Sequence, residues 1–382
     1  MEAIELLEIL ANGEDSKHQF KRNITNPDSL AQEMIAFSNG DGGVIAIGVD
    51  DDGTIQGLSN EDIRRLNQMV SNSASEKVRP AINPKTENIP TEDGLVMVIT
   101  VHAGVNKPYH DNAGVFWVKS GADKRKATAR EEIQRLFQSS GLIHADETIT
   151  PTMTIADLDF DYFKQFFEKR YGDSIMDASL PLDSIIANMN LGKNGMLNLA
   201  GALLFGGNPS IKYPEFTVKA GSFPGTSLTS QTYLDSRDIT GKIGDIYQQT
   251  MAFILSNLRH IQGDMGVNSL GNLEIPRMVF EELVANALIH RDYFVTSPIK
   301  VFVFSNRVEI ISPGSLPNRL TVENIKAGNS NARNPVLASF ANYILPYRGY
   351  GSGIMRALEA YPDIEFTDDK EGNKFVVTIL RK

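Results

Sequence analysis

The chain has 382 residues, 41% of them hydrophobic and 22% charged, which suits two or three globular domains and is too long for one ordinary fold. It has no cysteines, no run of ~18 apolar residues and no signal-like start, so we expect a soluble, cytoplasmic protein without membrane spans, disulfides or thiolate metal sites. The net charge of -10 argues against a broad electrostatic attraction for nucleic acid.

Residues 1–145 predict an α+β domain. Periodic apolar residues predict helices over 2–11, 28–39, 60–73 and 129–139, and β-branched runs predict strands over 44–49, 95–101 and 115–119. The run Asp50-Asp-Asp-Gly53 is typical of a hairpin turn. Because this domain holds 15 basic and 21 acidic residues, any surface for nucleic acid must be local.

The sequence changes character after Gly141, where we place a linker, and residues 146–270 predict a central α/β connector. Helices are expected over 159–171, 182–189, 197–205 and 239–259, and a strand over 215–220. The sequence shows no internal repeat and no low-complexity tract. Residues 271–382 then form the third predicted domain.

The third domain opens with a helix that carries the most informative pattern in the chain. Glu282, Asn286 and His290 recur every four residues, so on a helix all three face one way while the apolar residues between them face the core. Such a face is typical of a helix that lines a pocket. Each residue also has a structural interpretation: an ion pair of Glu282 with Arg277 or Arg291, an amide bonded to backbone, and a satisfied core histidine.

Two glycine-containing turns follow this helix. Gly314 comes after a predicted strand and a proline, where a residue without a Cβ lets the backbone approach a ligand. The second is the loop Arg348-Gly349-Tyr-Gly351-Ser-Gly353, which opens a predicted helix, so its N–H groups could bind phosphate at the positive helix end. The guanidinium of Arg348 could bridge phosphate oxygens as well. Alone, such a loop is as often a flexible turn.

In order and spacing, the helix, the turn and the loop resemble the N-box and the two glycine boxes of the GHKL ATPases. The phrase Asn331-Ala-Arg333-Asn334-Pro335 strengthens the likeness to a divergent GHKL domain that follows a Schlafen-like or Alba-like module. Such proteins are described as ATP-binding proteins, transcriptional regulators or divergent AAA proteins. The resemblance implies a GHKL-like α/β sandwich, helices on a mixed sheet, that binds ATP with Mg²⁺.

The resemblance also suggests a role for each residue of the helix. Glu282 is expected to activate the hydrolytic water, because a carboxylate held beside a phosphate can act as a general base. Asn286 is expected to bind Mg²⁺ through its amide oxygen, since this ion prefers hard oxygen ligands. His290 is expected to form part of the pocket wall.

The remaining positions are expected to contact the nucleotide. Gly349, Gly351 and Gly353, together with Arg348, form the expected phosphate cradle. Most GHKL proteins read the adenine amino group with an aspartate two residues before the first glycine. This chain has Ser312 before Gly314, so the sequence leaves the base open. Arg333 is a candidate hinge for a lid, and the alternative is a helix that starts before Val336.

The N-terminal third independently resembles the Schlafen/AlbA-like signature. The likeness rests on Gly13-Glu14-Asp15-Ser16, on Gln19-Phe20-Lys21, on the run from Leu30 to Gly53 and on the later strands around Lys107-Pro108-Tyr109 and Trp117. It implies binding of nucleic acid, DNA rather than RNA. The candidate contacts are basic residues that would equally suit a solvated loop: Lys21, Arg22, Lys119, Lys124, Arg125 and Lys126.

Together these features predict a homo-oligomeric, nucleotide-dependent (Mg-ATP) regulator that associates with nucleic acid and has weak ATPase activity. Two alternatives stay open. One is a Schlafen-like metal-dependent nuclease or defence effector. Gln19 counts against it, because the nuclease pattern has a second glutamate there and only Glu14, Asp15 and Glu33 remain as acids. The other is a nucleotide sensor without hydrolysis, or an interaction scaffold.

Overall fold

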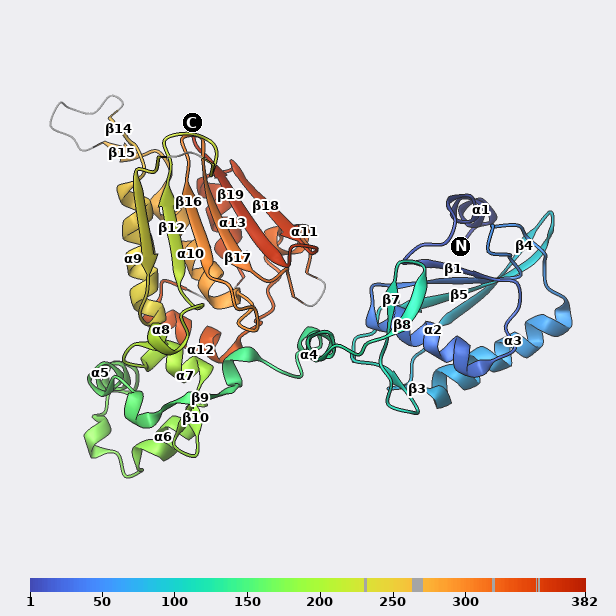
Figure 1. Cartoon of the computed structure of the whole chain (residues 1–382), viewed down its shortest axis with the longest axis horizontal. Coiled ribbons are helices and arrows are strands. Elements are labelled where there is room, and N and C mark those ends of the chain that lie inside the picture. Colours follow the sequence, from blue (N-terminus) through green and yellow to red (C-terminus); the bar gives the residue numbers. More distant parts are fainter. Residues whose placement is uncertain (230–231, 263–270, 318–319, 348, 350) are drawn as a thin grey trace. The chain divides into compact units, whose positions relative to one another are not determined.

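The computed structural model describes residues 1–229, 232–262, 271–317, 320–347, 349 and 351–382. The chain forms two compact units, Met1–Ile143 and His144–Lys382, and Figure 1 shows both. Helices and mixed sheets occur in each unit, so the predicted α+β class is confirmed. The expected connector, residues 146–270, shares one hydrophobic core with residues 271–382.

The N-terminal unit contains one four-stranded sheet, in the order β1-β2-β5-β4, with β1 and β2 parallel and the other neighbours antiparallel. Its elements are α1 (Ala3–Asn12), β1 (His18–Lys21), α2 (Pro27–Asn39), β2 (Gly42–Ile47), α3 (Asn60–Asn72), a π-helical turn (Ser73–Lys77), β3 (Val78–Arg79), β4 (Lys85–Thr91), β5 (Gly94–His102), β6 (His110–Asp111), β7 (Trp117–Ser120), β8 (Asp123–Lys126) and α4 (Arg130–Ser139). The four predicted helices are all present, whereas the sequence analysis missed β1 and β4.

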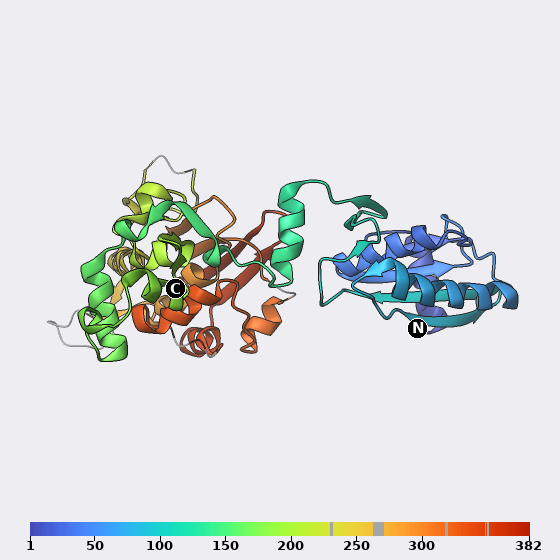
Figure 2. The same ribbon diagram turned by 90° about the horizontal axis from the view of Figure 1, so that it is seen from below.

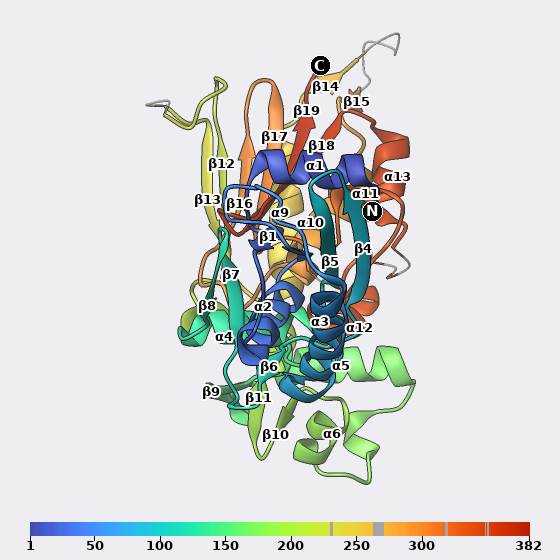
Figure 3. The same ribbon diagram turned by 90° about the vertical axis from the view of Figure 1, so that its right-hand side faces the viewer.

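Helices cover both faces of this sheet. Leu6 and Leu10 of α1 pack on one face, and the apolar side of α2 packs with α3 on the other. Figures 1 and 3 show α1 on one side of the strands, and Figure 2 looks onto α2 and α3 on the other. Helix α2 begins at Pro27, one residue before the predicted start, because the side chain of Asn26 accepts hydrogen bonds from two N–H groups of the first turn.

The C-terminal unit is built on a six-stranded mixed sheet and a smaller three-stranded one. Its elements are two short 3-10 turns (Ala145–Glu147, Ile155–Asp157), β9 (Ile149–Thr154), α5 (Phe160–Tyr171), a third 3-10 turn (Ile175–Asp177), α6 (Leu182–Asn188), β10 (Gly192–Lys193), β11 (Met196–Asn198), α7 (Leu199–Phe205), α8 (Pro209–Lys212), β12 (Val218–Ser222), β13 (Asp235–Ile239), α9 (Ile243–Ser256), β14 (His260–Ile261), β15 (Asn272–Leu273), α10 (Arg277–His290), β16 (Ile299–Val303), β17 (Arg307–Pro313), α11 (Val322–Lys326), α12 (Pro335–Ile344), α13 (Gly353–Ala360), β18 (Ile364–Asp369) and β19 (Lys374–Leu380).

The large sheet runs β13-β12-β16-β17-β19-β18, and only the β12–β16 neighbours are parallel. Burial alternates along its strands, as in β16, where Ile299, Val301 and Val303 are buried. This period of two means that one face is covered, and α9, α10 and α13 lie on it (Figure 1). The result is the predicted sandwich of helices on a mixed sheet.

Two predicted helices begin later than the sequence pattern suggested. The helix expected over 239–259 starts at Ile243, because Gly241, at φ 125°, breaks the chain after strand β13. The helix expected over 197–205 starts at Leu199, because the side chain of Asn198 accepts a hydrogen bond from the N–H of Gly201 and caps it.

Across the described ranges, no helix has both the length and the apolar character needed to cross a membrane.

Candidate functional site

Glu282, Asn286 and His290 of α10 line one cavity of the C-terminal unit. Apolar side chains from three neighbouring strands, β17, β18 and β19, line it as well. The glycine loop before α13 contributes further residues. Other described members of the lining include Ile310, Ser312, Gly314, Ser330, Tyr347, Gly349, Gly351, Gly353, Arg356, Phe366, Phe375 and Val377. The helix, the turn and the loop, distant in sequence, therefore meet at one cavity.

Glu282 is buried and forms an ion pair with Arg356, a residue that the sequence analysis did not single out. The two partners considered from sequence are engaged elsewhere. Arg277 pairs with Glu281 at 2.7 Å, and the guanidinium of Arg291 donates to backbone carbonyls at 2.7 and 3.1 Å. A charged pair at the cavity wall thus replaces the surface pair that sequence alone allowed.

Glycine is favoured at the three positions of the loop for two different physical reasons. Gly349 and Gly351 have φ of 71° and 72°, a backbone conformation that strongly favours glycine. At Gly353, the first residue of α13, a Cβ would overlap the carboxylate of Glu282. Glycine at this position therefore lets the start of α13 lie against the acid and the amide of α10.

We expect the substitution Gly353→Ala to destabilise the C-terminal unit by about 1 to 3 kcal/mol, because the added methyl group must displace the Glu282 side chain. Urea unfolding of the full chain followed by far-ultraviolet circular dichroism measures this change. Gly225→Ala is the matched control, since a Cβ there meets nothing within 4 Å. Equal stabilities of the two variants would contradict the close packing.

A hydrogen bond from Arg333 supports the turn at Gly314. Gly314 has φ of 95°, and Nη2 of Arg333 donates to the carbonyl of the next residue, Ser315, at 2.6 Å. The adjacent Asn334 is fully buried and its amide donates to the carbonyls of Ile289 and Arg291, both at 2.9 Å, at the end of α10. Arg333 would therefore affect a ligand in the cavity through the position of the Gly314 turn. The segment leads directly into α12, which begins at Pro335, and its role as a hinge stays a prediction.

His290 is neutral at neutral pH. Burial, with a smaller effect from the charge of Arg333, lowers the pKa of His290 to about 4. Its Nε2 and the hydroxyl of Tyr347 share a hydrogen bond of 3.0 Å. These contacts suit the pocket wall that we expected it to form.

Ser312 is buried at the end of β17, and its hydroxyl donates to the carbonyl of Ala287 at 3.2 Å. With its proton so engaged, the oxygen keeps lone pairs that can accept a hydrogen bond. Arg348, the predicted phosphate ligand, lies outside the described residues.

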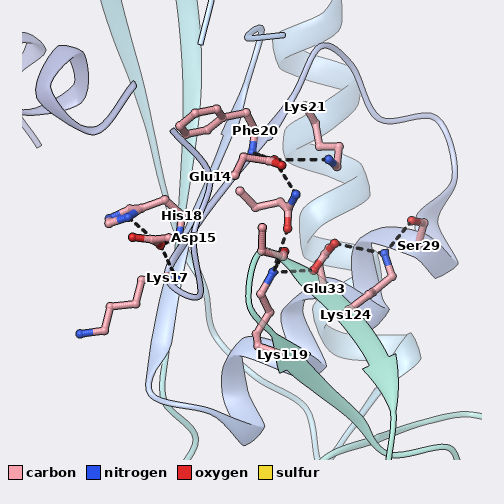
Figure 4. A network of polar contacts seen from close by, with 12 residues as sticks. Glu14, Asp15, Lys17, His18, Phe20, Lys21, Ser29, Glu33, Lys119 and Lys124 are labelled. Carbon is pink, nitrogen blue, oxygen red and sulfur yellow. Dashed lines mark hydrogen bonds and ion pairs between the residues drawn. The ribbon is translucent and has the colours of Figure 1, made fainter. Parts of the chain in front are cut away.

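In the N-terminal unit, the six basic residues do not form one exposed patch. Lys119 and Lys124 belong to the β7–β8 hairpin and have side chains only 7% and 19% exposed. Both point toward Glu33 of α2, as Figure 4 shows, so their charges are paired within the unit. Lys21 pairs with Glu14 at 3.6 Å. These three lysines are thus partly covered and paired with acids, so the expected contact with nucleic acid stays a prediction.

The other three basic residues remain at the surface. Arg22 is 73% exposed and Arg125 is 49% exposed, although Arg125 forms two hydrogen bonds with Glu132. Lys126 lies over the ring of Trp117, 5.6 Å from its centre. Arg22, Arg125 and Lys126 are therefore the candidates that could reach a phosphate backbone without breaking the interior.

Of the acids considered for a nuclease, Glu14 and Glu33 belong to this network, whereas Asp15 pairs with His18. The side-chain amide of Gln19 donates to Glu14 at 2.5 Å and its oxygen accepts from Lys119 at 2.8 Å, so it joins an anion to a cation. Over the described ranges, no group of three or more histidine, cysteine or acidic side chains could hold a metal ion. The network is arranged as a set of ion pairs.

Comparison with known families agrees with this architecture. Residues 14–128 match the family described as Schlafen, AlbA_2, and residues 296–379 match HATPase_c_4, described as "Putative ATP-dependent DNA helicase recG C-terminal". The chain thus has a Schlafen/AlbA_2 domain at its N-terminus and an HATPase_c_4 domain at its C-terminus. The second match begins after α10, so the assignments of Glu282, Asn286 and His290 rest on geometry.

Two solved structures resemble the chain weakly. The DIP2311 protein from Corynebacterium diphtheriae is 20% identical, the match covering 100% of this chain and 68% of that one, with a TM-score of 0.47. The N-terminal domain of a RecG-related protein from Nitrosomonas europaea is 23% identical, the match covering 34% of this chain and 96% of that one, with a TM-score of 0.26. No curated protein matches. The two domain types together indicate a nucleotide-dependent function associated with nucleic acid.

Proposed function

We propose that this protein is a cytoplasmic regulator that binds Mg-ATP in its C-terminal unit, hydrolyses it slowly in the manner of GHKL ATPases, and binds DNA through its N-terminal unit. The observation that carries the proposal is that Glu282, Asn286 and the glycine loop line one cavity. Regulation of transcription and self-association are parts of the same proposal.

The cavity suits a nucleotide at both ends. Near Ser312 its walls are apolar, with Ile310, Phe375 and Val377 available to cover a base. The hydroxyl oxygen of Ser312 can accept a hydrogen bond from an exocyclic amino group, which adenine has and which guanine lacks at the equivalent carbon. At the other end, the first N–H groups of α13 have no partners within the helix and form the positive end of its dipole.

The residues of the cavity could hold Mg²⁺ through one protein ligand. The amide oxygen of Asn286 is a hard donor, and the ion commonly keeps water and takes phosphate oxygens for its remaining positions. The ion would neutralise charge on the phosphates. In hydrolysis, a water oxygen bonds to the terminal phosphorus, its proton passes to Glu282, and the bond to the leaving diphosphate breaks.

Replacing Asn286 tests the nucleotide site. We expect Asn286→Ala to weaken binding of Mg-ATP by about tenfold or more, because it removes the magnesium ligand. Isothermal calorimetry with ATP and with GTP, each with Mg²⁺, measures this on the full chain. Asn188→Ala, at an exposed position of α6, is the matched control. A parent protein that binds neither nucleotide, or an Asn286→Ala variant that binds like the parent, would refute the site.

A second candidate function is a sensor that binds nucleotide without turnover. The observation that favours it is the ion pair of Glu282 with Arg356, which occupies the proposed base. Release of phosphate from ATP distinguishes the two candidates. Hydrolysis predicts that Glu282→Gln abolishes phosphate release above background, whereas a sensor predicts that the parent and the variant do not differ.

A further inference from the structure

Arg356 is the cationic side chain that lines the cavity among its described residues. It lies one turn into α13, three residues after Gly353, and lines the same cavity as Glu282 and Asn286. Its side chain is 26% exposed, whereas that of Glu282 is 8% exposed. The guanidinium therefore reaches the cavity surface from its place beside the acid.

The charges of the described cavity residues balance one another without a ligand. Among the described residues of the lining, Glu282 and Arg356 are the two that carry a formal charge, because the neighbouring His290 is neutral. A nucleoside triphosphate carries about four negative charges, and one Mg²⁺ offsets only two of them. The rest must be met by backbone N–H groups and by a cation of the protein, and Arg356 is a cation already at the wall.

The guanidinium has donors to spare. It offers five N–H groups in a planar fork, and the contact with Glu282 runs from Nη2. Its Nε is buried and has no hydrogen-bond partner in the described part of the chain. A guanidinium that the protein satisfies only in part can form charge-assisted hydrogen bonds with phosphate oxygens.

We propose that Arg356 binds the terminal phosphate of the nucleotide and, in doing so, releases Glu282 from their ion pair. This inference rests on the proposed function. Glu282 would deliver water to the terminal phosphorus, so a guanidinium paired with Glu282 stands at the same end of the cavity. The phosphate competes with the carboxylate for the guanidinium, and the acid becomes available as a base only when a third phosphate is present.

The mechanism separates triphosphates from diphosphates. A diphosphate leaves the ion pair of Glu282 and Arg356 in place, because it lacks the group that competes for the guanidinium. A triphosphate gains a charge-assisted contact that the diphosphate does not have. Arg356 is thus the residue by which the site distinguishes the substrate from the product, and it explains how one cavity can both restrain and use its base.

Calorimetry with two ligands tests this inference on the full chain. The probes are Mg²⁺ with the non-hydrolysable β,γ-imido analogue of ATP, and Mg²⁺ with ADP. We expect Arg356→Ala to weaken binding of the analogue by about tenfold or more and of ADP by less than about threefold. Arg356→Lys, which keeps the charge without the fork, should fall between Arg356→Ala and the parent. Arg277→Ala removes an ion pair on the exposed side of α10 and is the matched control.

Glu282→Gln provides an independent arm. It removes the carboxylate that competes for Arg356 and keeps the size of the side chain, so we expect the variant to bind the analogue at least about threefold tighter than the parent does. Equal weakening of both ligands by Arg356→Ala, or weaker binding of the analogue by Glu282→Gln, would overturn the inference and leave Arg356 with a structural role. If the parent binds neither ligand, the proposed function itself fails. If the parent binds both and Arg356→Ala changes neither, only this inference fails.

Discussion

Replacing Lys119 with alanine is expected to lower the free energy of unfolding of the N-terminal unit by about 3 to 5 kcal/mol, because it breaks a buried network of charges. Nζ of Lys119 donates to Gln19 at 2.8 Å and to the carbonyl of Ala122, lies 3.8 Å from Glu33 and stands over the ring of Phe37. Burial lowers the pKa of Lys119, and the nearby carboxylates oppose that shift. Without the lysine, Glu33 keeps a buried charge with Lys124 as its remaining partner.

Fluorescence reports this unfolding directly. The chain has a single tryptophan, Trp117, which lies two residues from Lys119 in β7 and packs against the core of this unit. Urea unfolding followed at this residue should shift strongly for Lys119→Ala and by less than about 1 kcal/mol for Arg130→Ala, an exposed control. The double variant Glu33→Gln with Lys119→Met removes both charges and should recover part of the loss. An unchanged midpoint for Lys119→Ala would show that the network contributes nothing to stability.

This expectation changes how binding experiments on the N-terminal unit are interpreted. A Lys119 variant loses stability as well as a charge, so its failure to bind nucleic acid would not locate an interface. Arg22 and Arg125 are exposed, so replacing them tests DNA binding with less risk to the fold. If a variant binds DNA more weakly and its affinity depends less steeply on salt concentration than that of the parent, the replaced residue contacts a phosphate.

The helical spacing predicted which residues of α10 line the cavity, whereas the local sequence did not predict how far the lysines of the β7–β8 hairpin are covered. Residues at i, i+4 and i+8 share one face of a helix whatever the rest of the chain does, so Glu282, Asn286 and His290 could be placed together from sequence. Arg356 could have been found in the same way, since side chains in the first turns of a helix lean back toward its N-terminus. The signal was an arginine one turn after the last glycine.

The burial of two of the basic residues could not be predicted from the sequence. Lys119 and Lys124 alternate with other residues in two short strands, and nothing local shows that this face of the hairpin lies on α2. Their burial depends on Glu33, about ninety positions away, which supplies the opposite charge. Pairing across such a separation is set by the fold, and a lysine-rich stretch by itself favours a solvated surface.

Replacing Asp146 with asparagine is expected to stabilise the C-terminal unit by about 3 kcal/mol near pH 7.5 and by about 1 kcal/mol near pH 4.5. Asp146 is fully buried, and its Oδ2 accepts a hydrogen bond of 2.9 Å from the N–H of Leu337 in the first turn of α12. Its Oδ1 is buried and has no hydrogen-bond partner among the described residues. Asparagine can accept the same hydrogen bond and carries no charge.

The sign of the pH dependence follows from the burial of this carboxyl. Burial raises the pKa of Asp146 to about 6, although hydrogen bonds from the start of α12 oppose the shift. Between the unfolded pKa of about 3.9 and this value the native state binds the proton more tightly, so the contribution of the acid is fully present below pH ~4 and is lost as the pH rises through ~6. An asparagine does not titrate and contributes equally at every pH.

The location of Asp146 makes this effect relevant to the proposed nucleotide site. Together with His144, whose Nδ1 lies 3.1 Å from the carbonyl of Arg333, it fastens the first residues of the C-terminal unit to the segment that holds the Gly314 turn. Urea unfolding of the parent, Asp146→Asn and Asp146→Ala at pH 4.5 and 7.5 measures the contribution. Alanine keeps no acceptor for Leu337, so this variant should be less stable than the asparagine variant at both pH values. A parent and an asparagine variant that differ equally at the two pH values would show that the carboxyl does not titrate between them, and the segment beside the turn would then be insensitive to pH in this range.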